Sequence, residues 1–283
     1  MYQKMKWFAT AFLIILFLTA CHTNNPLPRL PDEKHSELTL EDGIYFVKEE
    51  RFSDEGWKHT VTLEVTNSEI TDIVFDAINE SATATKKDSS AREIFALADA
   101  DALRWDEQIQ LLEEFMLINQ TVNFTRVIAS DILELLPDLT IDIQPFLNLM
   151  VLALNQEPIE IGPYRDGFYF ALQDEFENGI KEDVSLIVQH GHIIAIHWNG
   201  TNEDGTRRFG PLLAEAGLEE DISWRQQAIS VEQFLLSTQD PTSITFNADN
   251  TTDDIFGVTI EVNTFVELTI RALAAGPLLE EVD

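Results

Sequence analysis

The sequence is poor in cysteine and in positive charge. It holds a single cysteine, Cys21, among 283 residues, and 18 Lys and Arg against 50 Asp and Glu. One cysteine excludes a disulfide within the chain, so the hydrophobic cores alone must hold the fold together. A formal charge of −32 repels nucleic acid and anionic lipid head groups, which excludes nucleic acid as a partner.

The sequence also lacks the motifs of the common catalytic and metal-binding classes. It contains no P-loop, no dinucleotide fingerprint and no recognisable hydrolytic triad. The pair Asp99 and Asp101 lacks the remaining ligands of a calcium loop. His190 and His192 could ligate a metal, but a hairpin turn is the better interpretation, because the corresponding positions earlier in the chain are Asn67 and Glu69. We therefore predict no catalytic residue and no metal site.

The first twenty residues have the pattern of an export signal. Lys4 and Lys6 precede an apolar run over residues 8–17, which is shorter than the roughly 20 residues of a membrane span. The residues that follow, Leu-Thr-Ala-Cys at 18–21, resemble a bacterial lipobox. That resemblance implies a diacylated Cys21 as the mature N-terminus. An ordinary secretory cleavage beside an incidental cysteine is the alternative.

The segment after the signal is expected to be a tether. Residues 21–39 are polar and contain Pro26, Pro28 and Pro31, which favour an extended chain. Loss of Lys4 and Lys6 with the signal removes two positive charges, which takes the formal charge from −32 to −34. We therefore expect the acidic domains to be held at the extracytoplasmic face of the membrane by the lipid anchor, without lying on the membrane surface.

Two stretches of the remaining chain share landmarks in the same order. Residues 42–46 (Asp-Gly-Ile-Tyr-Phe) match residues 166–170 (Asp-Gly-Phe-Tyr-Phe), and Trp105 matches Trp224. The number of residues that separates the matching landmarks is that of a domain and is much longer than a solenoid repeat. We therefore predict two homologous domains in tandem. The predicted divisions are a signal peptide (1–20), a tether (21–39), domain 1 (40–155), a linker (156–163), domain 2 (164–276) and an acidic tail (277–283).

Each predicted domain reads as strands followed by helices. Alternation over residues 59–66, a turn at 67–68 and β-forming residues 70–75 predict a hairpin, and residues 184–198 repeat it. Apolar residues at helical spacing follow. The helices are expected at 91–100, 106–118 and 141–154 in domain 1, and at 224–237 and 260–275 in domain 2. Residues 244–246 are a short strand candidate. This order indicates an α+β fold, a small antiparallel sheet packed with helices in each domain.

Residues 42–58, residues 69–76 and the heptad at 253–259 (Asp-Asp-Ile-Phe-Gly-Val-Thr) resemble the FMN-binding domain lipoproteins of Gram-positive bacteria. In that family each domain ends in Asp-x-x-Ser/Thr-Gly-Ala-Thr, and a secreted flavin transferase attaches FMN to the last Thr by a phosphoester bond. The resemblance assigns the cofactor-binding positions to Asp253, Gly257 and Thr259. Phe256 replaces the Ser or Thr and Val258 the Ala, and both add bulk where the transferase would grip the loop.

The heptad of domain 1, residues 134–140, departs further from the family pattern. Thr140 alone matches outright, and Asp138 stands in place of the glycine. If that glycine supplies a positive φ, aspartate is a poorer substitute. Thr140 is therefore a weak second candidate for attachment, and domain 1 is expected to be a degenerate partner of domain 2.

The resemblance implies an electron carrier rather than a turnover enzyme. Covalent FMN on Thr259 would relay electrons from a membrane dehydrogenase or quinol donor to extracellular acceptors. A flavin-less interaction lipoprotein and a noncovalent FMN binder are the alternatives. By the same resemblance, residues 13–20 would yield a pheromone-like octapeptide. Without the resemblance, Thr259 would be a helix cap, and Trp105 and Trp224 would be core residues rather than flavin-stacking ones.

Overall fold

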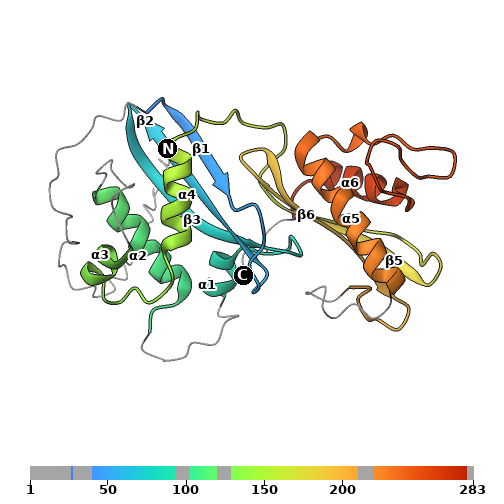
Figure 1. Cartoon of the computed structure of the whole chain (residues 1–283), viewed down its shortest axis with the longest axis horizontal. Helices are drawn as coiled ribbons and strands as arrows, with labels where there is room; N and C mark the ends of the chain where they lie inside the picture. Colours follow the sequence, from blue (N-terminus) through green and yellow to red (C-terminus); the bar gives the residue numbers. More distant parts are fainter. Residues whose placement is uncertain (1–26, 28–39, 93–101, 120–128, 210–218, 279–283) are drawn as a thin grey trace, which may run out of the picture.

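The fold is mixed α+β, as the sequence predicts. The structure is a computed structural model that describes residue 27 and residues 40–92, 102–119, 129–209 and 219–278 (Figure 1). Within these ranges, the chain forms two three-stranded antiparallel sheets and six α-helices. We call β1–β3 with α1–α4 the first unit, and β4–β6 with α5, η2 and α6 the second unit. The expected helix over residues 91–100 lies almost wholly outside the described residues.

The first unit is built on a meander of three strands in the order β1-β2-β3. The strands are β1 (Gly43–Lys48), β2 (Trp57–Thr66) and β3 (Glu69–Asn79). Alternate residues of β2, such as Val61 and Leu63, point into the core because side chains alternate across a strand. Asn67 and Ser68 form the β2–β3 turn with φ of 55° and 62°, the left-handed pair that a tight hairpin requires.

Helices cover one face of this sheet. They are α1 (Lys86–Ala91), α2 (Trp105–Ile118), α3 (Ala129–Leu135) and α4 (Gln144–Leu154). α2 packs against β3, and α4 packs against β1 and β2. Phe146 of α4 is fully buried at the centre, where its ring lies 4.9 Å from that of Phe75 and 6.1 Å from that of Trp105. Burying aromatic side chains of this size dominates the stability of such a small core.

The second unit likewise has three strands followed by helices. Its strands are β4 (Gly167–Leu172), β5 (Ile180–Gln189) and β6 (His192–Asn202); its helices are α5 (Glu219–Thr238), the 3₁₀ turn η2 (Pro241–Ser243) and α6 (Asn263–Ala275). The predicted turn between β5 and β6 is confirmed, with φ of 53° at His190 and 75° at Gly191. Trp198 takes the central place in this core, with its ring 4.7 Å from Trp224 and 5.1 Å from Phe265.

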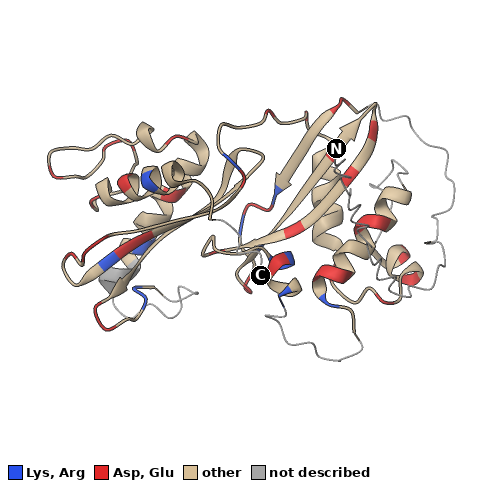
Figure 2. Cartoon of the chain, turned by 180° about the vertical axis from the view of Figure 1, so that it is seen from behind, with Lys and Arg blue, Asp and Glu red and all other residues tan. Residues whose placement is uncertain are grey.

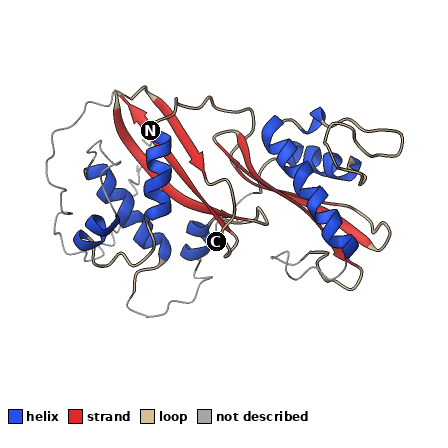
Figure 3. Cartoon of the chain, viewed as in Figure 1, coloured by secondary structure: helices blue, strands red, loops and turns tan. Residues whose placement is uncertain are grey.

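The two sheets lie between the helices of the two units. α2–α4 flank the first sheet on one side of the molecule, and α5 and α6 flank the second sheet on the other (Figures 1 and 3). A small apolar cluster joins the units, made of Ile78, Ala82, Ile187, Ile194 and Ala195, with Phe46, Phe52 and Phe168 at its margin. Polar contacts surround it: Lys48 Nζ donates to the Ile194 carbonyl at 2.7 Å, and Thr62 Oγ1 lies 3.0 Å from His190 Nε2.

Several parts of the fold differ from the sequence prediction. Residues 244–246 form no strand; they lead from η2 into a long loop fixed by side-chain hydrogen bonds. α4 begins at Gln144 and α6 at Asn263, three residues later than expected in each case. α1 begins at Lys86, before the first expected helix, and the Thr85 side chain caps its first turn. α3 was not predicted.

A close approach of two backbones fixes the path between the units. Gly162, in the segment that joins them, donates to the His190 carbonyl at 2.9 Å. A Cβ on Gly191 would lie 2.2 Å from the Gly162 carbonyl oxygen, whereas a Cβ on Gly205 would meet nothing within 4 Å. Both Gly191 and Gly205 have φ near 80°, at 75° and 85°, so they share the same backbone strain on substitution.

We expect Gly191→Ala to destabilise the protein much more than Gly205→Ala. Each change should cost about 1 kcal/mol from the positive φ, and the backbone overlap at Gly191 should add roughly 2 kcal/mol or more. Urea denaturation of the two variants checks this. Equal midpoints for the two variants would show that the approach of Gly162 to Gly191 does not constrain the fold.

A second prediction concerns Lys48 at the junction of the units. Burial, with the Lys58 charge as a smaller cause, lowers the pKa of Lys48 to about 8. Between pH 8 and about 10.4 the unfolded lysine keeps its proton while the folded one releases it, so the free energy of unfolding should rise with pH in this window. Lys48→Met should remove that rise. Lys181→Met, at a partly exposed lysine, should retain it.

Candidate functional site

The heptad that the resemblance singles out lies in the loop between η2 and α6. Within it, Ile255 and Val258 are buried in the core of the second unit, whereas Phe256, Gly257 and Thr259 are exposed. Phe256 is the extreme case, with a relative exposure of 104%. The loop is therefore anchored at two apolar residues and displays the residues between and after them to solvent.

A tight turn shapes the exposed part of the loop. The Val258 N–H donates to the Ile255 carbonyl at 3.2 Å, and Gly257 at the third position of the turn has a φ of 80°. A type II turn requires a positive φ at this position, which favours glycine. A Cβ on Gly257 would meet nothing within 4 Å. The glycine therefore serves the backbone conformation and not a close packing contact.

The two departures from the family pattern have different consequences. Val258 is only 6% exposed, so its extra bulk fills the core beside Val262 and Phe265. The expectation that Val258 obstructs the loop surface is therefore wrong. Phe256 does project from the surface, at the second position of the turn, and a transferase would have to accommodate it.

Thr259 follows the turn, and its hydroxyl is held by a side chain from α5. The Thr259 N–H donates to Gln227 Oε1 at 2.6 Å, and Thr259 Oγ1 donates to the same oxygen at 3.2 Å. Thr259 does not cap a helix, because α6 begins at Asn263 with Val262 at the N-cap position. The expectation that Thr259 directly precedes a helix is therefore wrong.

An acidic residue of the heptad, Asp254, fastens the loop. Asp254 accepts hydrogen bonds from the Thr245 N–H and hydroxyl, both at 2.7 Å, and these bonds hold the pKa of Asp254 below its usual value. Asp253, the residue that matches the family's aspartate, is exposed beside it. The hydrogen bonds to Thr245 that hold this loop are thus made by Asp254 and not by the residue that matches the family's aspartate.

The loop of the first unit has the same construction despite its different sequence. The Leu139 N–H donates to the Leu136 carbonyl at 3.0 Å, both leucines are buried, and Thr140 is exposed. Asp138 does not join the described residues with a positive φ. With Pro137 before it, this geometry is that of a type I turn, so aspartate is accommodated by a change of turn type.

Thr140 is held by a glutamine in the same way as Thr259. Gln108 Oε1 accepts from the Thr140 N–H at 2.7 Å and from Thr140 Oγ1 at 3.2 Å. Gln108 Nε2 is itself fixed by the Leu103 carbonyl at 2.8 Å. Neither Gln108 nor Gln227 was predicted as a site residue. The signal was present: 227 minus 108 is 119, the spacing that relates Trp105 to Trp224.

A buried charged network positions α5, and with it Gln227. Arg225 pairs with Glu232 at 2.5 Å, and Glu232 Oε1 accepts from the Trp198 N–H at 2.7 Å. Arg225 Nη2 donates to His197 Nδ1 at 3.1 Å. Burial, together with the Arg225 charge, lowers the pKa of His197 to about 3. The imidazole therefore stays neutral and serves as an acceptor for the guanidinium.

Trp224 and Trp105 do not offer free faces to a flavin. Trp224 is buried, its ring stacks on Phe209 at 5.3 Å, and the Arg208 guanidinium lies 4.0 Å from its centre. Trp105 packs against the core of the first unit with Lys86 Nζ 5.2 Å from its ring. Trp224 is therefore a core residue, and Trp105 is a partly buried residue packed against its core. Among the described residues, no group of three or more His, Cys, Asp or Glu could hold a metal.

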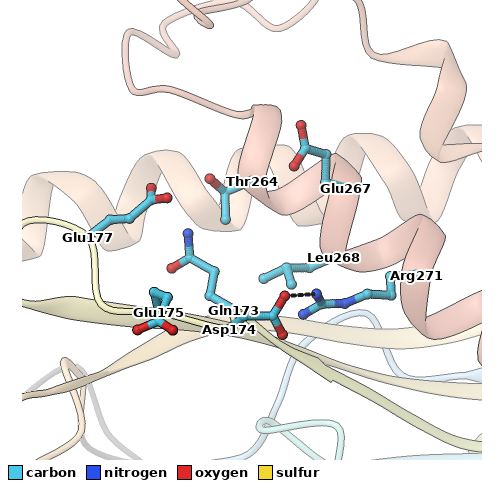
Figure 4. A pocket seen from close by; sticks show the side chains of 8 residues that line it. All are labelled: Gln173, Asp174, Glu175, Glu177, Thr264, Glu267, Leu268 and Arg271. Carbon is cyan, nitrogen blue, oxygen red and sulfur yellow. Dashed lines mark hydrogen bonds and ion pairs between the residues drawn. The ribbon is translucent and has the colours of Figure 1, made fainter.

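Two adjoining pockets lie between the β4–β5 connection and α6. The larger has a volume of about 340 Å³ and is lined by Gln173, Asp174, Glu175, Glu177, Thr264, Glu267, Leu268 and Arg271 (Figure 4). The smaller, about 190 Å³, shares Gln173, Glu177 and Thr264 with it. Neither includes Asp253, Gly257 or Thr259. Their largely acidic lining, part of the general excess of Asp and Glu over both units (Figure 2), does not suit a phosphate.

The predicted lipidation site, Cys21, and the signal segment lie outside the described residues. In the part of the chain that is described, none of the helices has the length and apolar character needed to span a bilayer.

Comparison with known proteins leaves the family of this chain open. No protein-family model matches it, and no curated protein matches it. A solution NMR structure of a protein from Clostridium thermocellum is 36% identical in sequence, and the match covers 41% of this chain and 95% of that one. The TM-score is 0.34, so the likeness supports no structural argument.

The network around α5 predicts a dependence of stability on acid. An unfolded histidine takes up a proton near pH 6.5, whereas folded His197 stays neutral down to about pH 3. The unfolded state therefore binds more protons in this window, and the free energy of unfolding should fall as pH falls below 6.5. His197→Gln should flatten this fall, as measured by urea denaturation. His192→Gln, at a side chain bonded only at the surface, should leave the slope unchanged; an unchanged slope in His197→Gln would contradict the assignment.

Proposed function

We propose that this chain is a lipid-anchored, extracytoplasmic flavoprotein that carries FMN covalently on Thr259 and transfers electrons to extracellular acceptors. Cys21 would bear the lipid, and a secreted flavin transferase would attach the cofactor. Electrons would come from a membrane dehydrogenase or a quinol. The protein is proposed as an electron carrier, with the redox chemistry supplied by the flavin when it is bound.

The observation that carries the proposal is the presentation of the Thr259 hydroxyl. It is exposed, it follows a turn that needs glycine at position 257, and its rotamer is fixed by Gln227. These features fit a residue that is modified by an external enzyme, which must reach the hydroxyl and the backbone around it. They are features of this chain and do not depend on the family pattern.

The surroundings of Thr259 favour covalent over noncovalent attachment. The carboxylates of Asp253 and Asp254 are exposed in the same loop, so they would repel a phosphate and could not retain it by charge. A covalent phosphoester bond retains the phosphate without any attraction from positive charges.

We further propose that the two units are homologous domains, at residues 40–155 and 164–276. Matched contacts support this: Tyr45 OH donates to the Glu41 carbonyl at 2.9 Å, and Tyr169 OH donates to the Arg165 carbonyl at 2.5 Å. At the ends of the units, the Ile159 and Leu278 N–H groups donate to the Ile44 and Phe168 carbonyls, each at 2.7 Å. Such details are unnecessary for an α+β fold and point to common descent.

Phe256 supports a second candidate function. A fully exposed aromatic side chain on a loop with a fixed backbone is the type of residue that anchors protein interfaces. On this interpretation the chain is an interaction lipoprotein without flavin, and the loop binds a partner protein directly. The same residue would serve as an anchor for the transferase in the main proposal, so flavin content decides between the two.

The test is flavin fluorescence of the full chain after denaturing gel electrophoresis. The chain should be isolated from its native membrane or co-produced with a flavin transferase. We expect a fluorescent band whose flavin maps to the peptide that holds Thr259 and disappears in Thr259→Ala. Thr140→Ala should leave most of the fluorescence in place.

The alternatives give different results in the same experiment. Flavin that co-purifies with the native protein but leaves it on denaturation would indicate noncovalent binding. A dark band from cells in which other flavoproteins fluoresce would reject the flavin proposal and favour the interaction lipoprotein.

A further inference from the structure

We propose that Gln227 is the positioning residue that presents the Thr259 hydroxyl for modification, and that Gln108 presents Thr140 in the same way. The inference rests on the proposed function and adds to it the residue on which attachment depends. Its basis is one contact that occurs twice, in segments more than a hundred residues apart in sequence.

The geometry makes the glutamine amide oxygen a double acceptor. In the second unit, Gln227 Oε1 receives the Thr259 N–H at 2.6 Å and the hydroxyl at 3.2 Å. The amide bond fixes where the backbone of Thr259 lies, and the hydroxyl bond selects one rotamer of its side chain. Thr259 itself is exposed, so a transferase can reach the hydroxyl from the solvent side.

The recurrence in the first unit argues against coincidence. Gln108 Oε1 makes the two equivalent bonds to Thr140 at 2.7 and 3.2 Å. The heptads that precede the two threonines differ at most positions, and the turns are of different types. The threonine and the glutamine stay the same while the residues between the two buried anchors change. The contact is therefore a feature that the two loops share in spite of their different sequences.

The chemistry of attachment explains why a fixed hydroxyl matters. Thr259 Oγ1 would form a bond to the phosphorus next to the flavin in a flavin adenine dinucleotide. The pyrophosphate P–O bond would break, AMP would leave, and the hydroxyl proton would pass to a base of the transferase. A neutral amide such as Gln227 cannot act as that base. Gln227 contributes by orienting the hydroxyl, because a hydroxyl that is already oriented loses less conformational entropy when it reacts.

Two side chains on α5 allow a matched experiment. Gln227→Leu keeps the size of the side chain and removes the acceptor, whereas Gln227→Glu keeps an oxygen that can accept both bonds. Gln226→Leu makes the same chemical change at the exposed neighbouring position and serves as the control. Unfolding midpoints of all variants show whether each one is folded.

The first readout is the Thr259 amide signal in the full chain labelled with [15N]threonine, which Thr259→Ala identifies. We expect the signal to shift and its hydrogen exchange to accelerate in Gln227→Leu. The Gln226→Leu signal should match that of the original chain. An unshifted, equally protected Thr259 amide in Gln227→Leu would overturn the inference whether or not flavin is attached.

The second readout is the initial rate at which the transferase labels Thr259 in the full chain with flavin adenine dinucleotide, followed by peptide mass. We expect Gln227→Leu to lower the rate roughly tenfold, equivalent to the loss of one hydrogen bond. Gln227→Glu should recover most of it, and Gln226→Leu should label normally. A rescue by Glu would not follow from a purely structural role of the glutamine.

The two proposals fail in different ways. If the original chain is labelled on Thr259 and Gln227→Leu is labelled at the same rate, the inference is wrong and the proposed function stands. If the original chain is never labelled, the proposed function fails, and with it the role of Gln227 in modification.

Discussion

Each unit depends on a buried carboxylate that closes the edge of its sheet. β3 and β6 are edge strands, and the N–H groups of Phe75 and Trp198 donate to Glu113 and Glu232 at 2.7 Å. An open edge N–H would otherwise invite pairing with another chain. Burial raises the pKa of both glutamates, and the cation beside each, Lys87 or Arg225, opposes that rise.

The bond from each glutamate to its strand also determines which residues of α2 and α5 face the loop. Once Glu113 or Glu232 is tied to its strand, the register of α2 or α5 against the sheet is fixed. The residue five positions earlier, Gln108 or Gln227, then faces the loop that leads into the last helix. The candidate site is thus a consequence of how the helix is attached to the sheet. The loop residues contribute the turn and the hydroxyl, and the helix contributes their orientation.

The acidic surface and the exposed loop both fit the proposed role as an electron carrier held near a membrane. A strongly acidic body resists adsorption to anionic surfaces, and the tether would keep it near the membrane. A cofactor on Thr259 would sit on the outside of such a body and meet partners directly. Phe256 projects from the same turn, so any partner that approaches Thr259 would also meet an apolar side chain.

The sequence by itself determined the α+β class, the hairpins and the two cores, because side-chain alternation and helical periodicity are local properties. It also identified the glycine of the turn, whose φ of 80° is a local requirement. It placed the starts of α4 and α6 three residues too early, since helix ends depend on contacts. Only the tertiary structure decided that Val258 is buried and that Phe256 is exposed. It alone brought Gln108 to Thr140 and Gln227 to Thr259, because these pairs are 32 residues apart and meet only when the helix packs on the sheet.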